Sequence, residues 1–255
     1  MIRELGVFFA ALRFFTRLPV PSWVGHSEQQ LEQAARYFPL VGIIVGGIGA
    51  LVTVAAARPL PSSLAILAGM AATLLVTGAF HEDGLADAAD GFGGGGDKSR
   101  VLEIMKDSRI GSYGAIAITL MLLAKFNALA QIEALDGRWV LASALVAGHA
   151  LSRFASTMLI CTLHYAREDD SAKARALARR LPAAELAVAA LFGLAPCLLL
   201  AASKVWVAIV LAAAVTLLCA VYFVRRIGGY TGDCLGATQQ VAELAFYVGL
   251  LCVSS

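Results

Sequence analysis

Charged residues are scarce in this sequence. They make up 15% of the 255 residues, against about 25% in soluble domains, whereas hydrophobic residues make up 59%, against about 45–50%. This composition argues against an ordinary soluble domain and is typical of an integral membrane protein. The net charge is only +2, so the totals indicate neither a nucleic-acid-binding surface nor an acidic disordered tail.

The sequence also shows neither closely spaced cysteine pairs nor the pattern of a signal peptide. The five cysteines contain no C-x-x-C pair, which excludes a thioredoxin-type site and a recognisable zinc cluster. The N-terminus mixes arginines with phenylalanines and lacks the uninterrupted apolar core of a signal peptide, so we expect it to stay on the mature protein. We interpret residues 1–36 as an interfacial segment, with a helix over residues 3–18 that Pro19 and Pro21 end.

Long apolar runs are abundant, and a bilayer core of roughly 30 Å needs about 20 such residues. Interruptions are few: Lys125, His149 and Arg153 lie inside two of the runs, and Glu243 lies inside the last. We therefore predict an all-α, polytopic integral membrane helix bundle of six to seven transmembrane helices, built as a single domain over residues 1–255. The runs cover residues 37–57, 59–80, 113–135, 139–165, 186–203, 205–224 and 234–253.

Lysine and arginine are distributed unevenly between the two sides of these spans. Fifteen of the 20 lie in the N-terminal segment or in the loops 81–112, 166–182 and 225–240, and three lie in the opposite connections. The positive-inside rule then places the N-terminus and the long loops in the cytoplasm, with the chain in the cytoplasmic (inner) membrane. Because the opposite connections are short, we expect the chemistry on the cytoplasmic side, and we expect the loop 166–182 to form an amphipathic surface segment.

Seven of the 18 acidic residues lie in the loop 81–112. Asp83, Asp87 and Asp90 have the spacing i, i+4, i+7, which on a helix places three carboxylates within about 60° of one another. No lysine or arginine lies between them. Mg²⁺ takes oxygen ligands and is usually held by one or two carboxylates plus substrate phosphates. The loop therefore predicts a magnesium site, with Asp97 and Glu103 as further ligand candidates.

The glycines at positions 91–96 are expected to end this helix, and Asp97 or Ser99 to cap a second one. On that second helix Arg100, Glu103 and Asp107 would share a face. We interpret the two helices as the walls of a metal–diphosphate site. Its predicted phosphate-binding cations are Arg100, Lys106 and Arg109, and Asp107 is predicted to position or deprotonate an attacking hydroxyl. The alternative is a solvated polar loop whose glycines only make turns.

A second glycine-rich motif loop spans residues 225–237. Thr231, Gly232 and Asp233 precede a helix, and a helix start suits anions through its free N–H groups, although a carboxylate there is more often a cap. His81 ends the second span, where it is either a substrate contact or an ordinary interfacial histidine.

Lys125 and Arg153 are too deep in their spans to remain unpaired at low cost. Glu243 is the acid available at comparable depth, and we predict that it neutralises one of them. A water-filled cavity that solvates each charge separately is the alternative.

Several motifs together resemble the cobalamin synthase family, the adenosylcobinamide-GDP ribazoletransferases. The resemblance covers essentially the whole chain and implies an Mg²⁺-dependent membrane enzyme that joins adenosylcobinamide-GDP to α-ribazole or its 5′-phosphate and releases GMP, completing the nucleotide loop of vitamin B12. The family pattern often has an apolar residue where this chain has Glu82, so no ligand role is carried over to Glu82. The motifs are FFTRLPVP at 14–21, RYFPLVG at 36–42, HEDGLADAADG at 81–91, RVLEIMKDSRIGSYG at 100–114 and GGYTGDCLGA at 228–237.

Rival functions remain open at this point. CDP-alcohol phosphotransferases and prenyltransferases also bind metal–diphosphate groups through carboxylates on membrane helices, but the Ala-Arg dipeptide of the former is missing after Asp90-Gly91. A cation transporter would place its acids near the middle of the membrane, where only Glu243 is expected. The oligomeric state is open, with a homo-oligomer among the alternatives.

Overall fold

The computed structural model describes residues 2–24, 30, 33–167 and 181–252. Within these ranges the chain is helical and its one β-contact is an isolated bridge, so the predicted all-α class is confirmed. The segment predicted to be amphipathic lies largely at residues 168–180, outside the described residues. The elements are α1 (Ile2–Phe15), η1 (Ala34–Tyr37), α3 (Phe38–Ala56), α4 (Ser62–Thr77), α5 (Phe80–Gly94), α6 (Lys98–Ile104), α7 (Ser112–Asp136), α8 (Arg138–Thr162), α10 (Ala183–Leu194), η2 (Ala195–Leu199), α11 (Ala202–Ile227) and α12 (Gly232–Leu251).

Four helical segments of the described chain are long and apolar enough to cross a membrane, and α4 with α5 makes a fifth if the bent pair is one span. The four are Ala34–Ala56, Ser112–Asp136, Arg138–Thr162 and Ala202–Ile227. The polytopic architecture therefore stands, although the number of helices that qualify is below the predicted six to seven.

Two predicted spans account for the difference. The run 186–203 is not one helix, because α10 ends at Leu194 and Pro196 begins the tighter η2; together they remain shorter than a span. α12 has 20 residues but misses the apolar criterion, since Gln239, Gln240 and Glu243 lie in its middle. These polar side chains are buried against other helices.

A sharp corner separates α4 from α5. Gly78 and Ala79 both have left-handed backbone conformations, with φ of 65° and 57°, and the two helices meet at 85°. The backbone N–H of Arg17 donates to the Val76 carbonyl at 2.7 Å, which ties the N-terminal segment to this corner. α4 alone has 16 residues and is long enough for a span only together with α5. Because α5 carries four carboxylates, we treat α4 as the apolar part of this bent pair and place α5 outside the apolar layer.

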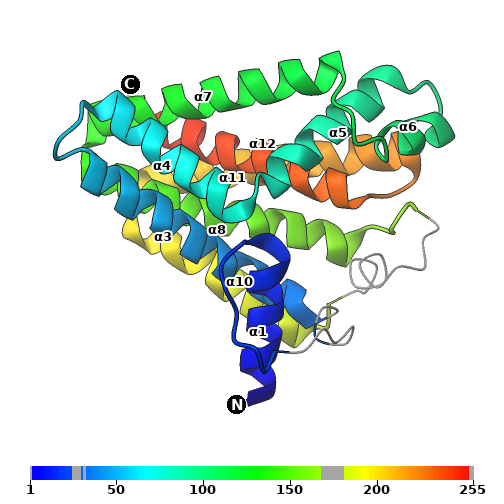
Figure 1. Cartoon of the computed structure of the whole chain (residues 1–255), viewed down its shortest axis with the longest axis horizontal. Coiled ribbons are helices and arrows are strands. Elements are labelled where there is room, and N and C mark those ends of the chain that lie inside the picture. Colours follow the sequence, from blue (N-terminus) through cyan, green and yellow to red (C-terminus); the bar gives the residue numbers. More distant parts are fainter. Residues whose placement is uncertain (1, 25–29, 31–32, 168–180, 253–255) are drawn as a thin grey trace.

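Helix α12 runs through the middle of the bundle, between α7 and α8, and α6 packs beside α5 at one end (Figure 1). α3 lies along α8, where glycine permits a close approach: a Cβ on Gly46 would lie 2.6 Å from the Leu145 carbonyl oxygen. The N-terminal helix α1 is confirmed. It ends at Phe15 and buries Val7, Ala11 and Phe15 against the end of the bundle that also holds α5.

Candidate functional site

The site is organised by the crossing of α5 with the first turns of α12. A Cβ on Gly84 would lie 3.2 Å from the Gly236 Cα and 3.2 Å from the Asp233 carbonyl oxygen, so the two backbones are almost in contact. A larger residue at either glycine would push the helices apart. The crossing sets Asp83 and Asp87 of α5 beside Asp233 of α12.

The electrostatics of Asp87 show that these carboxylates influence one another. Burial, together with the negative charges of Asp233, Asp83 and Asp90, raises the pKa of Asp87 to about 7, while Arg167 acts in the opposite direction. Near pH 7 this carboxyl is therefore still about half protonated, whereas an ordinary aspartate has lost its proton. A bound cation would favour its release.

Arg167 is the cation of this cluster, and sequence reasoning did not single it out as a site residue. Its Nη2 lies 2.7 Å from Oδ2 of Asp233, and both side chains are largely buried. The only sequence signal was its place as the first basic residue after α8.

Main-chain hydrogen bonds bring Arg167 to this position. The Tyr230 N–H donates to the His164 carbonyl at 2.9 Å, and the Ala166 N–H donates to the Tyr230 carbonyl at 2.8 Å. Gly229 lies so close to the His164 carbonyl that a Cβ would collide with it. The glycine-rich loop thus serves to attach the end of α8 to the start of α12.

The predicted residues of this loop have distinct contacts. Thr231 is buried and caps α12 by accepting the Cys234 N–H at 3.3 Å, and Gly232 and Asp233 line a cavity. The cap of α12 is thus Thr231 and not the carboxylate of Asp233, which lies beside the α5 carboxylates.

Asp90 has a structural contact that its spacing did not predict. Its two carboxylate oxygens accept the backbone N–H groups of Gly111, at 2.7 Å, and Gly114, at 2.8 Å, and the residue is 8% exposed. Asp90 therefore caps α7 from another helix and satisfies N–H groups that a helix start leaves unpaired. We leave it out of the ligand set below.

The glycines at 91–96 end the acidic helix as predicted: Gly94 is the last residue of α5, and Gly95 is its C-cap. The second helix is shorter than predicted. α6 ends at Ile104, so Asp107 lies beyond it and does not share a face with Arg100 and Glu103. Asp97 does cap α6, accepting the Arg100 N–H at 2.9 Å.

The remaining predicted residues surround a separate, open hollow of about 480 Å³. Arg100 pairs with Glu103 at 2.8 Å and Arg109 pairs with Asp107 at 2.6 Å, all at the surface, and Lys106 is exposed nearby. Hydrogen bonds from Arg109 lower the pKa of Asp107 to about 2. A carboxylate this acidic is a poor proton acceptor at neutral pH, so the predicted base role of Asp107 is not supported.

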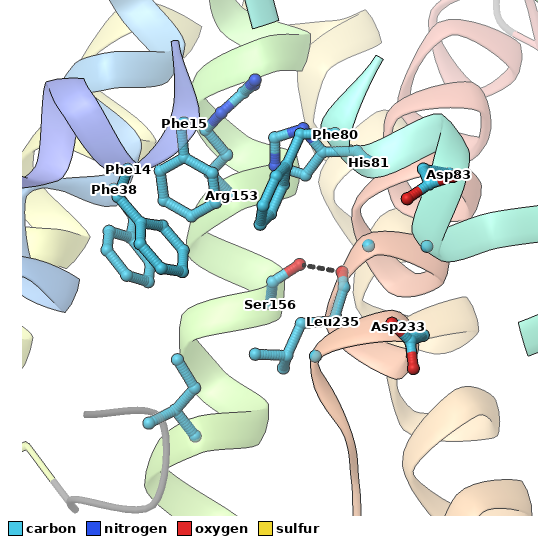
Figure 2. A pocket seen from close by; sticks show the side chains of 14 residues that line it. Phe14, Phe15, Phe38, Phe80, His81, Asp83, Arg153, Ser156, Asp233 and Leu235 are labelled. Atoms are coloured by element: carbon cyan, nitrogen blue, oxygen red, sulfur yellow. Dashed lines mark hydrogen bonds between the residues drawn. The ribbon is translucent and has the colours of Figure 1, made fainter. Parts of the chain in front are cut away.

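A smaller cavity of about 80 Å³ lies on the other side of the carboxylates (Figure 2). Asp83 and Asp233 border it, and aromatic rings from α1, α3 and α5 form its walls. His81 is 4% exposed and stacks on Phe15, with ring centroids 5.1 Å apart. The predicted site residues are thus divided between two hollows, with α5 running from one to the other.

No preformed metal cage was found in the part of the chain that the structure describes: no group of three or more His, Cys, Asp or Glu side chains there is arranged to hold an ion. Mg²⁺ does not require such a cage, because it is bound through one or two carboxylates, waters and substrate phosphates.

The chain is similar to a well-populated family over almost its whole length. A family model described as cobalamin-5-phosphate synthase matches residues 7–251. A Shewanella frigidimarina protein is 47% identical over 252 residues, covering 99% of this chain and 96% of the relative. A Leptothrix cholodnii protein is 45% identical over 260 residues (98% and 97%), and a Ralstonia nicotianae protein is 49% identical over 237 residues (92% and 90%). All three are named adenosylcobinamide-GDP ribazoletransferase. No solved structure shows a significant match.

Proposed function

The chain belongs to the cobalamin-5-phosphate synthase family, and from this membership we propose that it joins adenosylcobinamide-GDP to α-ribazole or α-ribazole 5′-phosphate and releases GMP. The observation that carries the proposal is the family match over residues 7–251, which includes both motif loops. The rival metal–diphosphate enzymes have no comparable support. The transporter reading is also disfavoured, because the deep acid Glu243 is paired with Lys125.

In this reaction a free hydroxyl oxygen of the ribose attacks the phosphorus that is bonded to cobinamide, the hydroxyl proton is released, and the bond to the second phosphate breaks so that GMP leaves. Negative charge develops on the phosphate oxygens, so the site must offer positive charge close to them. Arg167 is the nearest guanidinium to the carboxylate cluster, and its buried Nε has no hydrogen-bond partner among the described residues. We assign Arg167 to a phosphate oxygen at the reacting centre.

We propose that Asp83, Asp87 and Asp233 hold Mg²⁺, directly or through water. The support is electrostatic: Asp87 has a raised pKa because Asp233 and Asp83 add negative charge that Arg167 offsets only in part. When bound, the ion would supply Lewis-acid stabilisation of the phosphate oxygens. Asp97 and Glu103 are not included, since they cap α6 and pair with Arg100.

The donor and the acceptor need separate binding regions on either side of the carboxylates. The open hollow beside α6 has the size and the arginines for the GDP group, and Arg100 and Arg109 can form charge-assisted hydrogen bonds to its phosphates. Asp83 borders the aromatic cavity and Asp90 borders the open hollow, seven residues apart on α5, or about 10 Å at 1.5 Å per residue. The reacting phosphorus would lie between them.

We infer that the site faces the cytoplasm. The support is the excess of lysine and arginine in the loops 81–112, 166–182 and 225–240, which flank the site. The membrane would then be the cytoplasmic (inner) membrane.

The test is release of GMP by detergent-purified protein supplied with adenosylcobinamide-GDP and α-ribazole, with and without Mg²⁺. Release that requires both the acceptor and the metal is expected. Release without the acceptor would indicate hydrolysis, and release in the presence of a chelator would remove the magnesium assignment while leaving the transferase.

A further inference from the structure

The small cavity beside the carboxylates has an interior unlike the rest of the site. Four phenylalanines line it, and they come from three segments that are distant in the sequence. Figure 2 shows the rings and Arg153 on one side of the cavity and the carboxylates of Asp83 and Asp233 on the other. The rings belong to Phe14, Phe15, Phe38, Phe80 and His81.

The rings hold one another in place. Phe15 meets Phe38 edge-on at 4.4 Å between centroids and stacks on His81, and Phe80 packs edge-on against Phe15 at 5.3 Å. Such an arrangement offers an apolar aromatic wall whose rings are held in place by one another. The open volume is about 80 Å³, which suits a single ring system better than a whole nucleotide.

Few polar groups lie in the interior, and their hydrogen bonds show which donors and acceptors remain for a ligand. Arg153 is 2% exposed, and its buried Nε donor has no partner among the described residues. Ser156 donates to the Leu235 carbonyl at 2.8 Å, which occupies both groups. The wall of the cavity therefore includes a side chain with a buried donor that has no partner among the described residues, whereas carboxylate acceptors lie at its border.

We propose that this cavity receives the aromatic base of the ribazole acceptor, with the ribose directed toward Asp83 and Asp233. This inference rests on the proposed function. The base of ribazole is a flat bicycle with an apolar edge, a ring-nitrogen acceptor and no ring N–H once it is joined to ribose. Guanine, the base of the donor, carries several N–H donors on its edge and would leave them unpaired against phenylalanine at a considerable cost.

This position of the base also determines where the attacking oxygen lies relative to the donor phosphorus. A base seated against Phe80 and His81 leaves the ribose hydroxyls on the side of the carboxylate cluster, where the donor phosphorus is proposed to lie. Holding the acceptor this way converts the attack into a reaction between two oriented groups.

The experiment compares two phenylalanines of α5. Phe80→Leu removes a ring from the cavity wall, and Phe92→Leu removes a half-buried ring that packs on Tyr222 and Phe223, away from the cavity. Each KM is measured with the other substrate saturating. Phe80→Leu is expected to raise the KM for α-ribazole about tenfold and to leave the KM for adenosylcobinamide-GDP within about twofold. Phe92→Leu is expected to change neither.

A rise confined to the KM for adenosylcobinamide-GDP, or an equal rise in both, would overturn the assignment, and so would no change. Should Phe80→Leu fail to fold, as judged by its thermal transition, Phe14→Leu removes the neighbouring ring of the same wall, whose centroid lies 5.4 Å from that of Phe80. If the unaltered protein releases no GMP, the proposed function fails separately. Equilibrium dialysis with α-ribazole then tests the assignment of the cavity. Binding that is weaker in Phe80→Leu supports the assignment, and absence of binding to the unaltered protein overturns it.

Discussion

The ammonium group of Lys125 lies 2.9 Å from Oε1 of Glu243, deep between α7 and α12, where the two side chains are only 6% and 3% exposed. The prediction that Glu243 neutralises one of the deep cations is therefore confirmed. The pair is part of a larger polar network: Tyr247 and Gln239 donate to Glu243, and Gln240 connects Lys125 to Glu82 of α5 through hydrogen bonds of 2.8 and 2.9 Å.

Breaking this pair should destabilise the protein. Glu243→Gln or Lys125→Met leaves the other charge buried without its counter-ion, which typically costs about 3–5 kcal/mol. We expect a lower thermal transition of the detergent-purified protein for each single variant. The reciprocal exchange, Lys125→Glu with Glu243→Lys, should recover part of the loss; an exchange no more stable than either single variant would show that the surroundings, and not the pair, determine stability.

Asp87 should control the metal dependence. Asp87→Asn removes the carboxylate that feels the negative charge of both Asp233 and Asp83, so we expect turnover to fall at least about a hundredfold and the Mg²⁺ concentration for half-maximal activity to rise. GMP release as a function of Mg²⁺ measures both. Glu4→Gln, which alters an exposed carboxylate of α1, is the control and should behave as the unaltered protein. Unchanged Mg²⁺ dependence in Asp87→Asn would remove Asp87 from the metal site.

The raised pKa of Asp87 predicts a pH dependence of stability with a definite sign. The folded protein holds this proton up to about pH 7, whereas the unfolded chain releases it near the ordinary value of 3.8. The stabilisation is therefore fully present below about pH 4 and is lost as the pH rises through 7. Without Mg²⁺, this carboxyl should lower the melting temperature between pH 5 and 8, and Mg²⁺ should restore it. Asp87→Asn should remove this contribution, so a variant with the same slope would contradict the assignment.

Asp90 should behave as a cap of α7 rather than as a ligand. Asp90→Asn places an amide against the Gly111 and Gly114 N–H groups, so we expect a loss of about 1–3 kcal/mol in stability. Because this contact does not involve the carboxylate cluster directly, the folded fraction should keep its Mg²⁺ requirement. A shifted Mg²⁺ curve with an unchanged melting temperature would indicate the opposite role.

Asp107 should not be the proton acceptor. With its pKa held at about 2 by Arg109, it is ionised throughout the range in which the enzyme can be assayed. Asp107→Asn should therefore leave the shape of the pH profile between 5 and 8 unchanged and should act mainly on the KM for adenosylcobinamide-GDP, through the freed Arg109. If Asp107→Asn abolished the change of activity on one side of the pH profile, Asp107 would again be the candidate for the proton acceptor.

The sequence alone determined the class of the protein and much of its chemistry. The scarcity of charge left apolar runs that have no stable arrangement in lipid other than helices, because a helix satisfies its own backbone. Because charged residues are scarce in these runs, Glu243 was the acid available to neutralise Lys125 or Arg153. The motif loops were long enough to indicate the family, and the spacing of Asp83 and Asp87 was sufficient to place both on one helix.

The tertiary structure decided which of these residues meet. Asp90 shares the spacing of the acidic stripe, yet its carboxylate caps α7, because the start of α7 packs against α5 and needs an acceptor. Arg167 joins the site only through the main-chain contact between Tyr230 and His164, and Asp233 only through the close approach of Gly84 and Gly236. Helical periodicity places side chains on one face of one helix, whereas contacts between helices depend on where backbones can approach, and a single sequence carries little information about that.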